Sequence, residues 1–314
     1  CKLMAKAIRQ IYGEKLAELG RTCGDLVVLD ADVSSSTQTK FFAAEHPDRF
    51  FNMGIAESNM VSTAAGLARE GFVPFVNTFA VFISSIGLIG ARALACYGNL
   101  NVKFAGAYCG LSDAFDGASH HATEDLAILR ALPNMKILVP SDAASSGALT
   151  KLAYDTPGPC YLRLSRDVYP DLYDETAVFT PGKGNIVRDG SDVTVIACGI
   201  LVHKALEAAK ALEQEGVSVR VVDMYSIKPI DKELILRCAK ETSAIVTAEE
   251  HSVIGGLGSA TAEVLATNSC VVPVQMVGVQ DTFTESGPYN ALLGKYGLDS
   301  TAVTSAIRTV LSKK

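Results

Sequence analysis

The sequence predicts an α/β protein of two domains, each built on a mostly parallel sheet flanked by helices. Three observations carry this prediction. The chain has 314 residues, 48% of them hydrophobic and 20% charged, which is an ordinary globular composition with ample apolar material for a core. Short apolar runs alternate with helical patterns along most of the chain. The alternation lapses between residues 168 and 190, in a stretch rich in Pro, Gly and charge, and then begins again.

The first half alternates strands and helices in the order that right-handed βαβ crossovers require. A helix over residues 4–19 ends at Gly20, and the run "DLVVLDADVSSST" is a short apolar strand that leads into a polar loop. The later elements predicted in this half are strands in 72–79, 101–110, 135–142 and 160–166, with helices in 82–98, 124–132 and 143–155.

The second half repeats the same general plan. Its predicted strands lie in 193–199, 218–224, 244–250 and 271–279, and its helices in 203–214, 231–240, 256–266 and 301–312. The predicted domain limits are therefore 1–175 for the first domain, 176–189 for a linker and 190–314 for the second domain.

Composition excludes several classes of function. With 28 basic and 34 acidic residues the net charge is −6, and no Lys/Arg run suggests a nucleic-acid partner. The longest apolar stretch, residues 73–95, is broken by Pro74, Asn77 and Arg92, so we expect no membrane span. The N-terminus lacks a signal-peptide core. Eight cysteines without a CxxC pair predict no zinc site and a reducing, cytoplasmic location.

One acid stands out by its surroundings. "FNMGIAESNM" places Glu57 in a stretch with no other charge. A carboxylate in apolar company is desolvated, paired or functional. Asp30, Asp32 and the polar run 34–37 follow a strand directly, at the sheet edge where open α/β folds bind ligands.

A second polar cluster lies in "AFDGASHHATEDLAILRALPNM", which feeds a predicted helix. Asp116, His120 and His121 are either turn residues or catalytic groups, since loops that follow strands hold such groups. Adjacent histidines point apart, which argues against a shared metal. Glu124 and Asp125 are predicted to complement the helix N-terminus.

Two further motifs have both a structural and a functional interpretation. Arg163 and Arg166, at the end of a strand, either form surface ion pairs or grip a phosphate. The run "IGGLGSA" lacks the GxGxxG spacing of dinucleotide-binding loops, so its glycines are predicted to pack closely against a sheet.

Several motifs together resemble one family. "NMGIAE", "NTFAVF", "DAFDGASHHATEDLAILRALPN", "ILVPSD" and "YLRLSR" are similar to the pyrimidine-binding domain of transketolases. "VVDMYSIKPID" and "AIVTAEEHSVIGGLGSATAEVL" are similar to the C-terminal domain of that superfamily. No GDG motif of the diphosphate-binding domain occurs here. The resemblance therefore implies the C-terminal subunit of a split transketolase, completed by an N-terminal subunit in an α2β2 assembly.

The resemblance implies thiamine diphosphate as cofactor, with its Mg²⁺ (or Ca²⁺) ion bound through the partner subunit. It gives Glu57 the task of hydrogen-bonding the aminopyrimidine ring, so that the exocyclic nitrogen can take the thiazolium proton; apolar neighbours favour the protonated acid. Phe79 and Phe82 match positions that line the pyrimidine pocket, with Phe82 as the stacking ring. Asp32 resembles an acid near the cofactor at the subunit boundary.

Substrate contacts are implied in the same way. His120 resembles the histidine that hydrogen-bonds the developing alkoxide, and Asp116 the acid that contacts a sugar hydroxyl. Arg166, Arg9 and Ser36 fall where the family grips the sugar phosphate. The chain departs from the family at Tyr108, where many transketolases have a phosphate-contacting histidine, which implies weaker phosphate binding or an unusual ketose.

The expected reaction is transfer of a two-carbon ketol unit from a ketose phosphate to an aldose. Three alternatives stay open: the β subunit of a 2-oxo-acid dehydrogenase, a 1-deoxyxylulose-phosphate synthase, and a non-catalytic regulatory subunit. The Asp116–His120 loop and "LSRDVYP" favour the transketolase, because the dehydrogenase needs no sugar-phosphate clamp.

Overall fold

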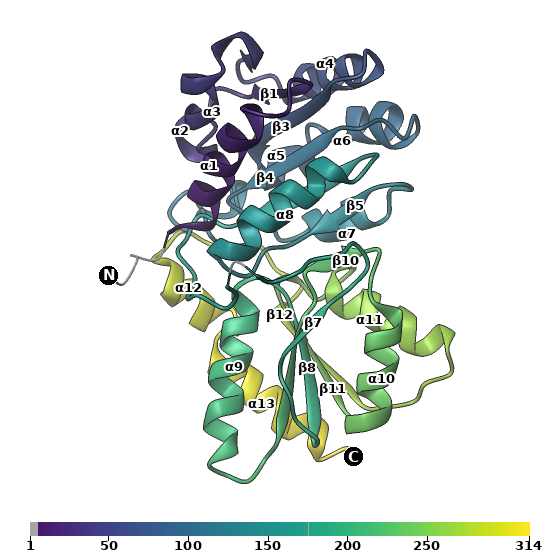
Figure 1. The fold of residues 1–314 in the computed structure, drawn as a ribbon. Helices are drawn as coiled ribbons and strands as arrows, with labels where there is room; N and C mark the ends of the chain where they lie inside the picture. Colours follow the sequence, from purple (N-terminus) through teal and green to yellow (C-terminus); the bar gives the residue numbers. More distant parts are fainter. Residues whose placement is uncertain (1–5, 175) are drawn as a thin grey trace.

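The computed structural model describes residues 6–174 and 176–314 and confirms the predicted two-domain α/β fold (Figure 1). The first domain has a sheet in the order β10-β5-β6-β4-β3-β1-β2. Its strands pair in parallel except β10 (Ser226–Lys228), which comes from the second half of the chain and pairs antiparallel with β5. The strands of this half are β1 (Leu26–Asp30), β2 (Phe50–Asn52), β3 (Val73–Phe79), β4 (Lys103–Ala107), β5 (Lys136–Leu138) and β6 (Cys160–Leu164).

Helices cover both faces of this sheet. The residues of β1, β4 and β6 are buried throughout, as expected for parallel strands covered on two sides. The helical elements of this half are α1 (Ile8–Gly20), α2 (Ser34–Thr37), α3 (Lys40–Glu45), η1 (Pro47–Arg49), α4 (Glu57–Arg69), α5 (Ala80–Ser84), α6 (Leu88–Gly90), η2 (Ala91–Cys96), η3 (Gly117–Ser119), α7 (Asp125–Arg130) and α8 (Ala143–Asp155).

The second domain has a sheet in the order β12-β11-β8-β9-β7, in which only β7 is antiparallel to its neighbour. Its strands are β7 (Asn185–Arg188), β8 (Val193–Ala197), β9 (Val219–Asp223), β11 (Ile245–Ser252) and β12 (Val274–Val279). Its helices are α9 (Ile200–Glu213), α10 (Lys232–Thr242), α11 (Leu257–Thr267), α12 (Tyr289–Lys295) and α13 (Ser300–Leu311).

Two predicted elements differ from the structure. The helix expected over 82–98 is divided into α5, α6 and the π-helical η2, with a turn at 85–87. Strand β7 lies inside the predicted linker and forms the edge of the second sheet next to β9. The expected start of the first helix, residues 4–5, lies outside the described residues.

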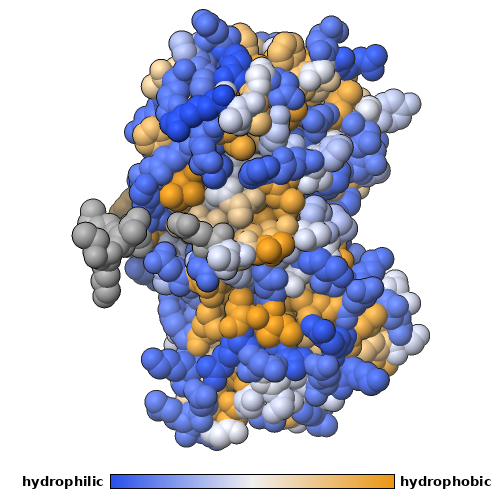
Figure 2. Space-filling view, in the orientation of Figure 1, coloured by the Kyte–Doolittle hydropathy of each residue, from blue (hydrophilic) through white to orange (hydrophobic). Residues whose placement is uncertain are grey.

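Two apolar clusters, one on each side of the sheets, run through both domains. One joins α1 and α8 to α9 and α13; the other joins α4, η2 and α7 to α10 and α11. The domains therefore pack as one unit. Figure 2 shows a largely hydrophilic surface with apolar side chains gathered between α9 and α10, where β7 runs. None of the helices in the described residues has the length and apolarity that crossing a membrane would require.

Candidate active site

The predicted site residues gather at the carboxyl edge of the first sheet. Arg166 follows β6, Tyr108 follows β4, Thr78 and Phe79 end β3, and Asp32 follows β1. Because β6, β4, β3 and β1 are neighbours in this order, these side chains form a row across the edge of the sheet.

Glu57 begins α4 and is 4% exposed. Among the described residues its carboxylate accepts one hydrogen bond, from Thr78 Oγ1 to Oε1 at 3.3 Å. Its position at the helix N-terminus favours a negative charge there. A buried acid with a single long hydrogen bond retains capacity to bind a polar group of a ligand.

Four aromatic rings, those of Phe79, Phe82, Tyr108 and His120, lie together at this edge, and Phe79 follows Thr78 directly. Phe79 stacks on Tyr108, with ring centroids 4.8 Å apart and planes inclined by 13°. His120 meets Phe79 and Phe82 edge-on, at centroid distances of 5.9 and 5.3 Å. Phe79, Phe82 and His120 are each partly exposed, so their rings are accessible to a flat ligand.

Tyr108 links this aromatic group to two arginines. Its backbone has a φ of 58°, a left-handed conformation that is unusual for a bulky residue and often marks functional sites. The guanidinium groups of Arg9 and Arg166 lie 5.2 and 5.3 Å from its ring centroid. Arg9 also donates hydrogen bonds to Tyr108 Oη and Ser36 O, both at 2.9 Å, and to Arg166 O at 3.3 Å.

Asp116 is exposed on the loop that leads to His120, and beside it lies an acid that sequence reasoning missed. Asp113 is fully buried, and neither carboxylate oxygen has a hydrogen-bond partner among the described residues. Its nearest counter-charge is Arg166, with Oδ1 and Nη1 3.6 Å apart. Burial and the charge of Asp116 raise the pKa of Asp113 to about 7. An acid in the apolar run "CGLSDAF" was the signal that could have identified it.

Asp32 has a φ of 64° and accepts a hydrogen bond from Asn52 Nδ2 at 2.7 Å. Two residues earlier, Asp30 is buried and accepts hydrogen bonds from Val33 N and the hydroxyls of Thr37 and Thr39. Burial raises the pKa of Asp30. Asp30 therefore has a structural task, ordering the loop after β1, whereas Asp32 is exposed at the sheet edge.

The domain boundary contains a buried ion pair that joins α7 to β6. Asp125 lies in the first turn of α7, but it pairs with Arg163, with Nε and Oδ2 2.8 Å apart, and both side chains are buried. Of the two roles left open for the arginines at the end of β6, Arg163 forms an ion pair, but a buried one, because every residue of β6 is buried. Its guanidinium also donates to the carbonyl oxygens of Ala122 and Glu250, each at 3.0 Å.

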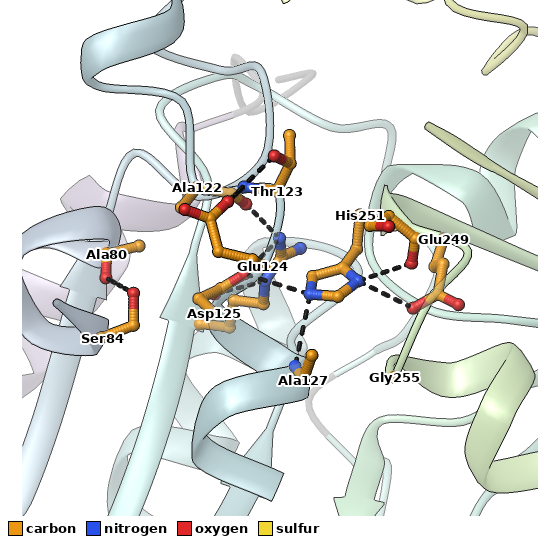
Figure 3. Close-up of polar contacts among 12 residues, drawn as sticks. Ala80, Ser84, Ala122, Thr123, Glu124, Asp125, Ala127, Glu249, His251 and Gly255 are labelled. Atoms are coloured by element: carbon orange, nitrogen blue, oxygen red, sulfur yellow. Dashed lines mark hydrogen bonds and ion pairs between the residues drawn. The ribbon is translucent and has the colours of Figure 1, made fainter. Parts of the chain in front are cut away.

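The second domain approaches this pair through β11 (Figure 3). His251 lies between the carboxylates of Asp125 and Glu249, at 3.9 and 3.7 Å. Its Nε2 accepts from Ala127 N at 3.3 Å. Glu249 in turn accepts from Leu257 N and Gly258 N at the start of α11. The predicted close packing of the "IGGLGSA" glycines is confirmed, since a Cβ at Gly256 would lie 2.0 Å from Glu249 Oε2.

The second domain also contacts and fixes the first-domain loop that carries Asp113, Asp116 and His120. Glu250 Oε1 accepts from Leu111 N at 2.7 Å, and burial raises the pKa of Glu250 to about 7. His121 Nδ1 lies 2.6 Å from the hydroxyl of Thr284. His121 is therefore bound into the domain boundary, while His120 faces the aromatic rings. No group of three or more potential metal-ligating side chains occurs in the part of the chain that the structure describes.

The chain is thus a two-domain α/β protein. Its sheet-edge site combines a buried acid, aromatic rings and paired arginines. Comparison with known families then places it. The model of the transketolase pyrimidine-binding domain matches residues 4–171, and that of the transketolase C-terminal domain matches residues 182–303. The chain belongs to the transketolase family, which confirms the resemblance found in the sequence.

Two relatives and one solved structure match over nearly their whole length. A putative transketolase C-terminal section of Methanocaldococcus jannaschii is 43% identical and aligned over 98% of both chains. A 6-deoxy-6-sulfo-D-fructose transketolase subunit of Clostridium sp. strain MSTE9 is 38% identical over 100% of this chain and 97% of its own. A solved structure described as a split-gene transketolase in an inactive β4 tetramer is 49% identical, with a TM-score of 0.90 over 98% of this chain and 99% of that one.

Proposed function

We propose that this chain is the C-terminal subunit of a thiamine-diphosphate-dependent transketolase that moves a two-carbon ketol unit from a ketose phosphate to an aldose. The observation that carries the proposal is the row of side chains from Glu57 to Arg166 along one sheet edge, in a chain that contains both transketolase domains. In this proposal a separate N-terminal subunit completes the site and binds the diphosphate with its Mg²⁺ (or Ca²⁺) ion.

The residues present fit the pyrimidine end of the cofactor. When bound, thiamine diphosphate supplies the electron sink for cleavage of the bond beside the ketose carbonyl. Glu57 holds a proton at a pyrimidine ring nitrogen, a task suited to a buried carboxyl with one long hydrogen bond. Phe79 and Phe82 offer partly exposed ring faces against which the pyrimidine would pack, and this would exclude water from Glu57.

The remaining residues of the row bind and orient the sugars. His120, held 3.0 Å from Ser119 Oγ through Nδ1, donates to the sugar oxygen on which negative charge develops. Asp116 accepts from a sugar hydroxyl, and Arg9 and Arg166 bind the distal anion, with Ser36 ordered by Arg9. The Clostridium relative is named for a sulfonated ketose, so the distal anion differs within the family.

Exposed apolar side chains beside Glu57 support a partner subunit. Ile55 is 84% exposed and Ile89 is 78% exposed. Ile86 is also exposed, and its carbonyl accepts from Ser58 Oγ at 2.8 Å, which places it next to the start of α4. Apolar surface of this kind is typical of protein interfaces. An N-terminal subunit that covers it would close the site in the proposed α2β2 assembly.

The experiment is to co-purify the chain with the product of its adjacent gene. The pair is then assayed with xylulose 5-phosphate, ribose 5-phosphate, thiamine diphosphate and magnesium. We expect ketol transfer by the pair and none by the chain alone. Turnover by the chain alone would contradict the split-site proposal. No transfer by the pair, together with activity on pyruvate and a lipoyl acceptor, would favour the dehydrogenase.

A further inference from the structure

The buried acid Asp113 lies under the proposed phosphate-binding arginines. It is 0% exposed, its carboxylate has no hydrogen-bond partner among the described residues, and Arg166 Nη1 is 3.6 Å away. A desolvated carboxylate with no hydrogen bond among the described residues and a 3.6 Å ion pair is costly, and such groups are retained in sites where their charge has a task. Because it lies 3.6 Å from the Arg166 guanidinium, its charge is close to any anion that Arg166 binds.

We propose that Asp113 is a specificity-determining residue whose negative charge opposes the sugar phosphate at Arg166, and so limits the preference of the site for phosphorylated over neutral sugars. This inference rests on the proposed transfer between sugars and adds to it the residue that sets the charge preference. A phosphate bound to Arg166 would meet the attraction of the guanidinium and the repulsion of the carboxylate behind it.

The local balance of charge supports this role. Two arginines are packed against one ring, that of Tyr108, and are joined by a hydrogen bond from Arg9 Nε to Arg166 O. Three acids belong to this group: Asp113 and half-buried Asp167 after β6, which both interact with the two arginines, and Asp116, which lies close enough to Asp113 to raise its pKa. With all acids ionised the acids outnumber the arginines, which makes this a poor environment for a doubly charged phosphate.

Protonation changes that balance. Burial and Asp116 raise the pKa of Asp113 to about 7, while Arg166 and Arg9 oppose the rise. Below that pH Asp113 is neutral and ceases to repel phosphate; above it the repulsion is complete. The titratable and charged groups that face Asp113 are Asp116 and His121 on its own loop, Arg9 from α1, and Arg166 after β6.

The test measures binding, so that it does not depend on turnover. Ribose 5-phosphate is titrated calorimetrically into the complex of the full chain with its N-terminal subunit, without a ketose donor. Asp113→Asn keeps the shape and removes the charge, and we expect about tenfold tighter binding at pH 8. At pH 6 the gain over the unmodified complex should be smaller. Each comparison is made at one pH, so the ionisation of the phosphate itself cancels.

Two further variants isolate the contact with Arg166. Asp167→Asn removes an equal charge near the same arginines but without the 3.6 Å pairing, and it should tighten binding by less than Asp113→Asn. In an Arg166→Ala background, in which the remaining binding is weaker, Asp113→Asn should still tighten binding, because the carboxylate repels the phosphate itself. Loss of the effect in that background would show that Asp113 acts only through Arg166 and would contradict the proposal.

The remaining outcomes are also decisive. Unchanged or weaker ribose 5-phosphate binding in Asp113→Asn would overturn the proposal. If the KM for unphosphorylated ribose as acceptor also rises in Asp113→Asn, the Asp113 carboxylate accepts a sugar hydroxyl and does not act by repelling phosphate. Tighter ribose 5-phosphate binding in a complex that transfers no ketol unit would support the inference and refute the proposed function.

Discussion

Glu57 combines burial with few hydrogen-bond partners, and this combination is what distinguishes it from the structural acids nearby. Asp30, equally buried, accepts three hydrogen bonds that fix the loop after β1. Glu57 accepts one long hydrogen bond, from Thr78. Since a protein rarely keeps a buried carboxylate so weakly satisfied, the free capacity of Glu57 is best explained by a ligand.

Replacement of Glu57 by glutamine therefore separates chemistry from folding. In Glu57→Gln the side-chain amide can keep the hydrogen bond from Thr78 but cannot exchange a proton with a pyrimidine ring, so ketol transfer by the two-subunit complex should fall at least ~100-fold. The urea midpoint of the chain should stay close to that of the unmodified protein. Glu70→Gln, exposed just after the same helix, is the matched control and should keep full activity. Equal activity of the two variants would remove Glu57 from the mechanism.

The loop over residues 109–121 shows how one element of the first domain depends on the second. Gly110 has a φ of 60°, and a Cβ there would lie 2.4 Å from Glu250 Cδ. The same glutamate accepts from Leu111 N. The loop that carries Asp113, Asp116 and His120 is thus clamped against β11 by a contact that only glycine allows.

Gly110→Ala should consequently destabilise the chain by more than backbone strain alone, by roughly 3 kcal/mol. The comparison is Gly216→Ala, at a φ of 79° with no atom of the described residues within 4 Å of the added Cβ, which should cost about 1 kcal/mol. Equilibrium urea unfolding measures both. Amide exchange in residues 110–121 should increase only in the Gly110→Ala variant. Similar losses in the two variants would show that the contact with Glu250 contributes nothing.

The sequence predicted the elements better than the contacts between them. Periodicity located most strands and long helices, because parallel strands buried on both faces read as continuous apolar runs. It could not pair Asp125 with Arg163, since two separate strand and helix patterns carry no information on which side chains meet across a boundary. Nor could it place β10, whose three residues join the first sheet through β5. Asp113 stands in an apolar run that could have marked it, but its pairing with Arg166 is a property of the folded loop.

The whole molecule is held together by polar contacts at the boundary as well as by the two apolar clusters. Asp142 caps α8 and also accepts from the backbone of Leu172 and Tyr173, so the chain leaving the first domain is fixed there. Asp223, at the end of β9, accepts from Ser141 Oγ and Tyr173 Oη. These acids are buried where the domains meet, and stability should therefore depend on their protonation.

The shifted pKa of Asp223 determines whether stability rises or falls with pH. Burial raises its pKa from the ordinary value of 3.8 to about 7 in the folded chain. Between those values the folded state binds the proton more strongly than the unfolded chain does. The free energy of unfolding should therefore fall as the pH rises from about 4 to about 7, by a few kcal/mol, since one pKa unit is worth about 1.4 kcal/mol.

Asp223→Asn removes the titrating group and keeps an amide that can meet Ser141 and Tyr173. We expect it to raise the urea midpoint more at pH 8 than at pH 5, which flattens the pH profile between them. Asp48→Asn, an exposed acid in η1, changes the net charge equally and should leave the shape of the profile as it was. If Asp223→Asn loses as much stability between pH 5 and pH 8 as the unmodified chain does, this carboxyl does not set the pH dependence. Glu250 would then be the group to replace next.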